Sequence, residues 1–281
     1  MDPDELREES RERWEAIAEG WEHGADAFYA GVLPVSHWMV EHLEPQPGQV
    51  ILELAAGRGD TGLLAAELVR PGGRVIITDG AEAMVEAARR NGERLGAHDV
   101  EFRTMELEWL DQPTASVDGI LCRFGYMLPV DPEAALREAR RVLKPGGRLV
   151  LATWDRPEQN PWMTAAGMAA RELGLAEAPD PDAPGPFRLS DPAKLADVVE
   201  DAGLDAPLVE PIELRFEVPN LDAWWDTVNA TSPTMRELLA GLSPADHYKL
   251  RDAAEARLAP FVRDDGSVAI PGRALGATTE A

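Results

Sequence analysis

The 281-residue chain has a single cysteine, Cys122, and no long apolar run. One thiol excludes an internal disulfide, which suits a reducing compartment. No uncharged apolar stretch approaches the ~18 residues that a membrane-spanning helix needs, so no transmembrane segment is expected. The first residues are acidic, so no secretory signal is expected there. These absences predict a cytoplasmic protein.

Basic residues are also scarce. The chain has 27 Lys and Arg residues and 51 Asp and Glu residues, which gives a net charge of −24. Such a field repels phosphate backbones and anionic lipid, so neither a nucleic acid nor a membrane is expected as a partner. The five histidines and the lone cysteine show no metal-ligand spacing, so no metal site is predicted. The sequence does not indicate an oligomeric state.

Apolar strand patterns alternate with helical ones after residue 48, with short loops between them. Strand–helix repeats of this kind predict a parallel sheet with helices on both faces. The fold class expected is α/β, a doubly wound, mostly parallel seven-stranded Rossmann-like sheet with N-terminal helices and a helical insertion before the last strand. The expected strands are 50–54, 74–78, 100–103, 117–122, 148–153, 209–216 and 273–278.

The segment 51–62 is the most informative part of the chain. An apolar strand carries Glu53, breaks into a turn with Gly57 and Gly59, and opens into a helix. A second apolar strand ends in Asp79, 20 residues after Gly59. Glycines let the backbone approach a ligand closely, and the N–H groups at a helix start are free to bind it. A carboxylate at the second strand end can hold ribose hydroxyls, so the segment predicts a site for an adenosine-bearing cofactor.

Two cofactors fit the glycines. The run from Gly57 to Gly62 matches G-x-G-x-x-G, which is typical of nicotinamide and flavin enzymes. Glu53 lies inside the first strand, where a dinucleotide site usually keeps apolar residues. Together with the turn at 143–148, these residues give the chain its resemblance. From about residue 47 to 155 it resembles the class I S-adenosylmethionine-dependent methyltransferases, in the ubiquinone/menaquinone C-methyltransferase branch.

The resemblance implies a role for each strand end in binding S-adenosylmethionine. The acid of the first strand steadies the glycine loop and faces the cofactor's amino group, and an alanine stands where the family usually has its first glycine. The acid of the second strand holds the ribose, and the residues after it and after the third strand flank the adenine. Backbone after the fourth strand contacts the methionine part. The implied residues are Glu53, Ala55, Gly57, Gly59, Asp79, Gly80, Met84, Glu106, Leu107, Arg123 and Phe124.

Aromatic residues near the expected mouth of the site suggest a flat or apolar acceptor. Each aromatic side chain also fits a core position. His37 lies in the N-terminal helical region, which the resemblance places over the cofactor, and it is the candidate base; a packing or surface histidine is the alternative. The candidate substrate residues are Tyr29, Tyr126, Trp154 and Trp162.

The predicted organisation is a single methyltransferase domain spanning residues 1–281. A helical cap covers 1–45, a cofactor-binding core 46–155, and a substrate-side half 156–281. The insertion at about 220–265 is too short to enclose a core of its own.

The predicted function is transfer of a methyl group from S-adenosylmethionine to a small-molecule acceptor, at an O, N or C centre. The transfer would be an in-line displacement in a desolvated pocket. Two alternatives stay open, namely an NAD-dependent oxidoreductase and a protein that binds S-adenosylmethionine without transferase activity. The sequence does not identify the acceptor.

Overall fold

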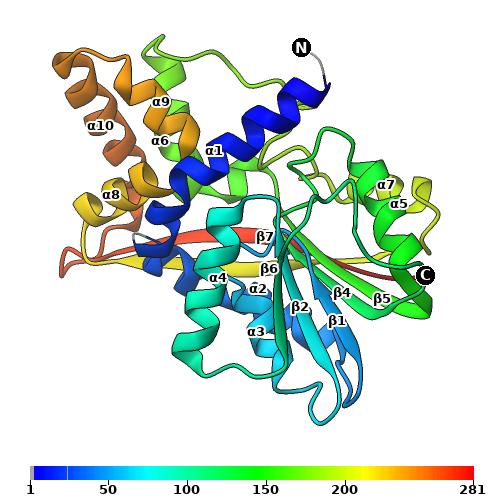
Figure 1. The fold of residues 1–281 in the computed structure, drawn as a ribbon. Helices are drawn as coiled ribbons and strands as arrows, with labels where there is room; N and C mark the ends of the chain where they lie inside the picture. The colour runs from blue at the N-terminus through cyan, green and yellow to red at the C-terminus, as the bar shows by residue number, and fades with distance from the viewer. Residues whose placement is uncertain (1–2, 24) are drawn as a thin grey trace.

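A seven-stranded sheet organises the molecule, with strand order β3-β2-β1-β4-β5-β7-β6 (Figure 1). The computed structural model describes residues 3–23 and 25–281. Strands β1 to β5 pair in parallel, and β7 pairs antiparallel with both β5 and β6. The expected fold class is therefore confirmed. The strands are β1 (Val50–Glu53), β2 (Arg74–Asp79), β3 (Val100–Thr104), β4 (Val117–Arg123), β5 (Leu143–Trp154), β6 (Leu208–Val218) and β7 (Val268–Glu280).

Helices cover both faces of this sheet, which explains why its central strands are apolar on both sides. Contacts with the strands place α2 (Asp26–Leu43), α3 (Asp60–Ala66) and α4 (Glu82–Leu95) on one face. The other face carries α5 (Pro132–Val142) and α6 (Pro161–Glu172), with α7 (Pro192–Asp201) packed beside α5.

Local sequence sets the helix ends. The Asp131 side chain accepts a hydrogen bond from the Ala134 N–H, and Pro132 follows at the first helical position of α5. Gly96, in the left-handed region at φ 66°, ends α4.

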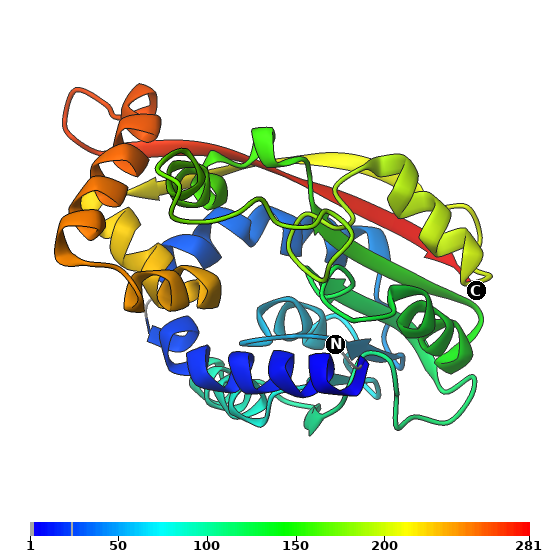
Figure 2. The same ribbon diagram turned by 90° about the horizontal axis from the view of Figure 1, so that it is seen from above.

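The remaining helices form a cap over one side of the molecule (Figure 2). They are α1 (Pro3–His23), α8 (Leu221–Thr231), α9 (Pro233–Ala240) and α10 (Pro244–Leu258). The segment 221–240 forms two helices, because Ser232 caps a new helix with Pro233 at its first position. Helix α1 contacts α4 as well as α8 and α9, so it joins the insertion to the sheet domain.

Most buried apolar side chains form one core around the sheet. A smaller cluster of Ala18, Ala81 and Met84 joins α1 to the start of α4. Short 3-10 turns follow β5 (Pro157–Gln159) and α10 (Ala259–Phe261). Across residues 3–23 and 25–281, no helix is both long and apolar enough to cross a bilayer.

Candidate functional site

The two acidic strand ends meet at the same edge and on the same face of the sheet. Glu53 pairs in register with Ile77, and Asp79 lies two residues further along β2. Side chains alternate along a strand, so Glu53, Ile77 and Asp79 point the same way. Asp79 accepts hydrogen bonds from the Gly57 N–H through Oδ2 (2.9 Å) and from the Ala81 N–H through Oδ1 (3.0 Å). It therefore ties the glycine turn to the end of β2.

Glu53 is a buried carboxyl with an unused acceptor atom. The residue is 2% exposed, and its Oε2 has no hydrogen-bond partner within the described residues. Burial raises its pKa to about 8, although the nearby Arg123 charge acts in the opposite direction. An orphaned acceptor in a buried position suits a ligand that brings a positive donor, such as an ammonium group.

The glycine that follows the turn makes room for this carboxyl. A Cβ added at Gly62 would lie 2.4 Å from Glu53 Oε2 and 3.1 Å from Ile77 Cγ1. The last glycine of the G-x-G-x-x-G match is therefore required by the acid on β1, which explains why both features occur together.

The turn itself has three residues in the left-handed region, Ala55 (φ 48°), Gly57 (φ 54°) and Gly59 (φ 73°). Glycine adopts this conformation freely, whereas alanine there costs roughly 1–2 kcal/mol. A Cβ at Gly57 would meet only the Tyr29 hydroxyl, at 3.7 Å. The space between Gly57 and Tyr29 is thus open, so a ligand could come close to the backbone of Gly57.

The adenine-side residues also lie together. Glu106 Oε2 would be 3.0 Å from a Cβ at Gly80, so its carboxylate crosses directly over that glycine. Met84 is buried against Ala18 of α1. Partial burial raises the pKa of Glu106, and the charges of Asp79 and Glu108 act in the same direction. Leu107 is partly buried and packs on the main core.

Helix α1 closes this side of the site, a contact that the sequence did not reveal. The Glu15 carboxylate accepts hydrogen bonds from the Glu82 N–H (2.6 Å) and the Ala83 N–H (3.0 Å) at the start of α4. Arg7 donates to both carboxylate oxygens of Glu108, from Nη2 (2.8 Å) and Nε (3.1 Å). These partners are 67 to 101 residues apart along the chain, so no local pattern links them.

A polar cluster beside the glycine turn was only partly foreseen. Arg58 lies over the Tyr29 ring, 3.7 Å from its centroid, and Arg123 lies 5.6 Å from the same centroid. Asp60 pairs with both, at 3.3 Å from Arg58 and 3.9 Å from Arg123. Arg58 and Asp60 were not predicted as site residues. Their positions within the glycine turn are the sequence signal that could have identified them. Tyr29 and Arg123 were predicted, and the structure brings them together.

Phe124 follows β4 in an unusual backbone conformation. Its φ of 61° is in the left-handed region, which is a real outlier for a bulky residue and typical of functional sites. Its ring stacks on Trp154, with centroids 4.0 Å apart and planes at 4°.

Three predicted acceptor residues lie deeper than expected. Trp154 is covered by Phe124, and Trp162 stacks on Phe216 of β6 with centroids 4.7 Å apart. Both indoles are buried and stack on protein rings, so their contact with a substrate stays a prediction. Tyr126 is buried too, and its hydroxyl has no hydrogen-bond partner among the described residues.

The exposure of His37 favours the alternative of a surface histidine over the predicted base. Helix α2 turns Phe28, Val32, Ser36 and Met39 inward, whereas His37 lies on the exposed outer face.

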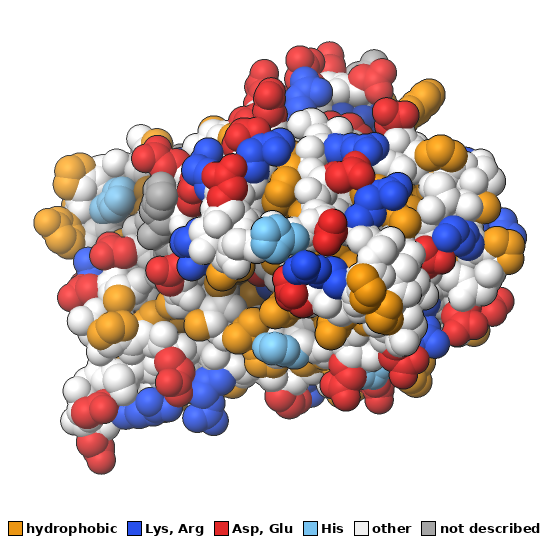
Figure 3. Space-filling view, turned by 60° about the horizontal axis from the view of Figure 1, so that its bottom comes forward, with side chains coloured by type: hydrophobic (Ala, Val, Ile, Leu, Met, Phe, Trp, Pro, Cys, Tyr) orange, Lys and Arg blue, Asp and Glu red, His pale blue; other side chains and the backbone are white. Residues whose placement is uncertain are grey.

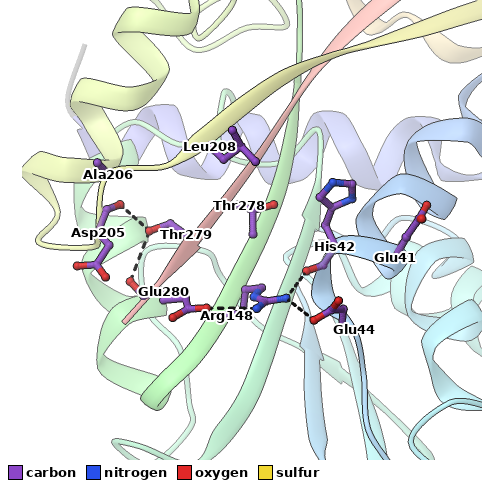
Figure 4. A pocket seen from close by; sticks show the side chains of 10 residues that line it. All are labelled: Glu41, His42, Glu44, Arg148, Asp205, Ala206, Leu208, Thr278, Thr279 and Glu280. Atoms are coloured by element: carbon purple, nitrogen blue, oxygen red, sulfur yellow. Dashed lines mark hydrogen bonds and ion pairs between the residues drawn. The ribbon is translucent and has the colours of Figure 1, made fainter.

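A separate hollow of about 570 Å³ lies at the other end of the strands, near the amino ends of the parallel ones (Figure 4). Arg148, near the start of the main run of β5, lines it and donates to the His42 carbonyl (2.7 Å). Arg148 also pairs with Glu44 and Glu280, each at 3.2 Å. Because it adjoins the amino end of the parallel strands, this hollow is not part of the site at Glu53 and Asp79.

Residues 51–147 match the family model of a methyltransferase domain. A ubiquinone/menaquinone biosynthesis C-methyltransferase of Caulobacter vibrioides is 36% identical over 128 residues, which cover 42% of this chain and 49% of that protein.

Solved structures match over more of the chain. The YcgJ protein of Bacillus subtilis has a TM-score of 0.57 at 21% identity, covering 87% of this chain and 97% of the other. Geranyl diphosphate C-methyltransferase of Streptomyces coelicolor, solved with S-adenosyl-L-homocysteine, has a TM-score of 0.51 at 17% identity, covering 88% and 75%.

The alignments with these curated relatives cover from 34% to 61% of each relative's length. Residues 51–147, which match the family model, contain both acidic strand ends and the glycine turn, whereas Tyr29 and helix α1 lie outside them. Residues 51–147 are thus similar to a methyltransferase domain, and the ubiquinone/menaquinone C-methyltransferases resemble this same part of the chain.

Proposed function

We propose that the protein transfers a methyl group from S-adenosylmethionine to a small-molecule acceptor, at an O, N or C centre. The observation that carries this proposal is the pair of carboxyls at adjacent strand ends. Glu53 keeps an unpaired buried oxygen, and Asp79 is fixed by the Gly57 and Ala81 N–H groups. An acceptor atom for an ammonium and a fixed acid for ribose hydroxyls meet two of the polar requirements of that cofactor.

Bound S-adenosylmethionine supplies an electrophilic methyl group on a sulfonium. In our proposal Glu53 faces its ammonium, Asp79 accepts from its ribose, and the adenine lies among Gly80, Met84, Glu106 and Leu107. Ala55, Gly57 and Gly59 bring the backbone of the turn close to it.

The chain's other contribution is to align the acceptor and exclude water. We propose that Tyr29, Phe124 and Tyr126 line the acceptor side, with Trp154 supporting Phe124 from behind. A dry aromatic wall favours a transition state in which positive charge fades. We further propose that residues 1–281 act as one domain, with α1 as the outer wall of the cofactor site.

Calorimetric titration with S-adenosylmethionine and S-adenosylhomocysteine tests the proposal first. We expect saturable binding of both, and binding of neither would end the idea. A screen of phenols, quinones and amines with methyl-labelled cofactor then tests transfer. Tight binding with no transfer across the screen would instead support a binding protein without transferase activity. A saturable NADH fluorescence shift would support the oxidoreductase alternative.

A further inference from the structure

Helix α1 contacts two parts of the molecule that are far apart in the sequence, the start of α4 and the α8–α9 pair (Figure 1, Figure 2). At the first of these, Ala18 packs on Ala81 and Met84, beside the residues proposed for the adenine. The Glu15 carboxylate accepts hydrogen bonds from two N–H groups in the first turn of α4. This part of α1 therefore lies on the adenine side of the proposed cofactor site.

The following residues of α1 are in backbone contact with the end of α8. A Cβ added at Gly20 would lie 2.3 Å from the Ala230 carbonyl oxygen, so a glycine is required for this approach. Trp21 Nε1 donates to the carbonyl of Thr231, the last residue of α8, at 3.1 Å. The last carbonyls of a helix have no partner within it, so Trp21 caps α8 from a distant part of the chain.

The Trp21 ring also touches the proposed acceptor side. Its centroid is 5.9 Å from that of Tyr29 and 4.9 Å from that of Phe28, and both contacts are edge-to-face. The Tyr29 hydroxyl is in turn the only atom that a Cβ added at Gly57 would meet. The same indole thus contacts the insertion through its N–H and the acceptor side through its ring.

The two sets of contacts are also close together on α1. Ala18 and Trp21 are three residues apart, which is about 4.5 Å along a helix. A helix is stiff over less than one turn, so α1 cannot shift on α4 without shifting on α8.

We propose that α1 couples the cofactor site to the α8–α9 pair, with Trp21 as the positioning residue between them. This inference rests on the proposed function, which places the adenine beside Met84. A ligand bound there adds contacts that depend on the position of α1, so it favours the state in which α1 is seated on α4. Seated α1 holds α8 and Tyr29 in place, so the acceptor side is complete in the cofactor-loaded protein. Linkage makes the effect reciprocal, so a loosened α8 should weaken cofactor binding.

Hydrogen exchange of the full chain, followed by mass spectrometry, tests the coupling with S-adenosylhomocysteine as the probe. In wild type, a saturating amount should slow amide exchange across α8 and α9, although none of the proposed cofactor residues lies there. Trp21→Phe keeps a ring and removes the N–H that donates to Thr231. We expect it to lose most of this ligand-induced slowing, and its affinity for the probe to fall about 2- to 10-fold, the range for one neutral hydrogen bond.

A second variant and two matched controls separate coupling from folding. Gly20→Ala forces α1 and α8 apart and should lose the same slowing. Trp38→Phe, whose ring stacks on His42 near the separate hollow, should behave as wild type. So should Gly167→Ala in α6, where an added Cβ meets nothing within 4 Å. Slow exchange in the central strand β4 shows that each variant is folded.

Two results would overturn the inference. The first is slowing in wild type that stops at α1 and α4 and does not reach residues 221–240. The second is full slowing of these residues in both Trp21→Phe and Gly20→Ala. Failure of wild type to bind S-adenosylhomocysteine at all would instead overturn the proposed function.

Discussion

Glu53 shows how a single buried carboxyl couples ligand binding to pH. Its pKa of about 8 means that the free protein holds this group mainly protonated at pH 7. An ammonium is bound by the ionised form, so S-adenosylhomocysteine affinity should rise as pH increases from 6.5 to 8.5. Calorimetry across this range checks it. Glu53→Gln should show weaker binding that does not follow this rise, and a wild-type affinity that falls with pH would contradict the prediction.

The same group should affect folding stability in the opposite direction. Because the folded-state pKa lies above the ordinary value of 4.5, the folded state binds more protons between pH 4.5 and about 8. This contribution to stability is complete below pH 4.5 and is lost as pH rises through 8. Glu53→Gln should therefore gain stability relative to wild type as pH approaches 8, measured by urea unfolding. A difference that stays constant with pH would show that Glu53 titrates normally.

Asp79 provides a direct test of the cofactor site. Asp79→Ala removes the acid proposed for the ribose and the acceptor for the Gly57 and Ala81 N–H groups. We expect S-adenosylhomocysteine affinity to fall about 10- to 100-fold, because hydrogen bonds to charged groups contribute about 1.5–3 kcal/mol. Asp252→Ala, exposed on α10, is the control and should bind as wild type. Unchanged affinity in Asp79→Ala would remove the ribose role.

At the scale of elements, the packing of β1 against α3 requires a glycine at position 62, because a side chain there would collide with Glu53. Gly62→Ala would place a Cβ 2.4 Å from Glu53 Oε2, which is too close for both to stay in place. Overpacking of this kind typically costs about 1–3 kcal/mol. We expect lower stability in urea unfolding together with weaker cofactor binding, because Glu53 must move. Gly167→Ala, where an added Cβ meets nothing within 4 Å, is the control. Normal cofactor binding by Gly62→Ala would mean that Glu53 does not contribute to binding the ligand.

The union of α1 and α4 is a second element-scale feature. Glu15 supplies from another helix the acceptor that α4 lacks in its own N-cap residue, Ala81. Loss of such a cap typically costs about 0.5–2 kcal/mol. Glu15→Ala should lower the free energy of unfolding by this amount in urea titrations. Glu12→Ala, exposed on the same helix, should stay within about 0.5 kcal/mol of wild type, and equal effects of the two changes would mean that the contact is unimportant.

At the scale of the whole molecule, excess acidic charge opposes compactness. The net charge is −24, and on the face in Figure 3 basic side chains stand among acidic ones without a broad basic patch. Salt screens this self-repulsion, although it also weakens exposed ion pairs, which contribute little. The thermal midpoint should therefore rise between 10 and about 500 mM NaCl, where screening shortens from tens of ångströms to a few. A falling midpoint in calorimetry would mean that surface ion pairs dominate.

The sequence by itself determined the sheet and the two acids. Strand and helix alternation is local, and the ends of parallel strands meet at one edge, so Glu53 and Asp79 had to converge once β1 and β2 were neighbours. The sequence was also sufficient to predict which face of α2 is buried. Helical spacing puts Phe28, Val32 and Met39 on one side, which leaves His37 on the other.

Only the tertiary structure decided which distant groups share the site. The Glu15 contact with α4 and the Arg123 contact with Ser36 join residues 67 to 87 positions apart, and no periodicity encodes them. Packing likewise turned Trp162 into the core and left Glu53 with an unpaired oxygen. Local sequence sets the type of each element, because backbone hydrogen bonds and apolar period are local. The angles and depths at which elements meet depend on side-chain packing across the whole core.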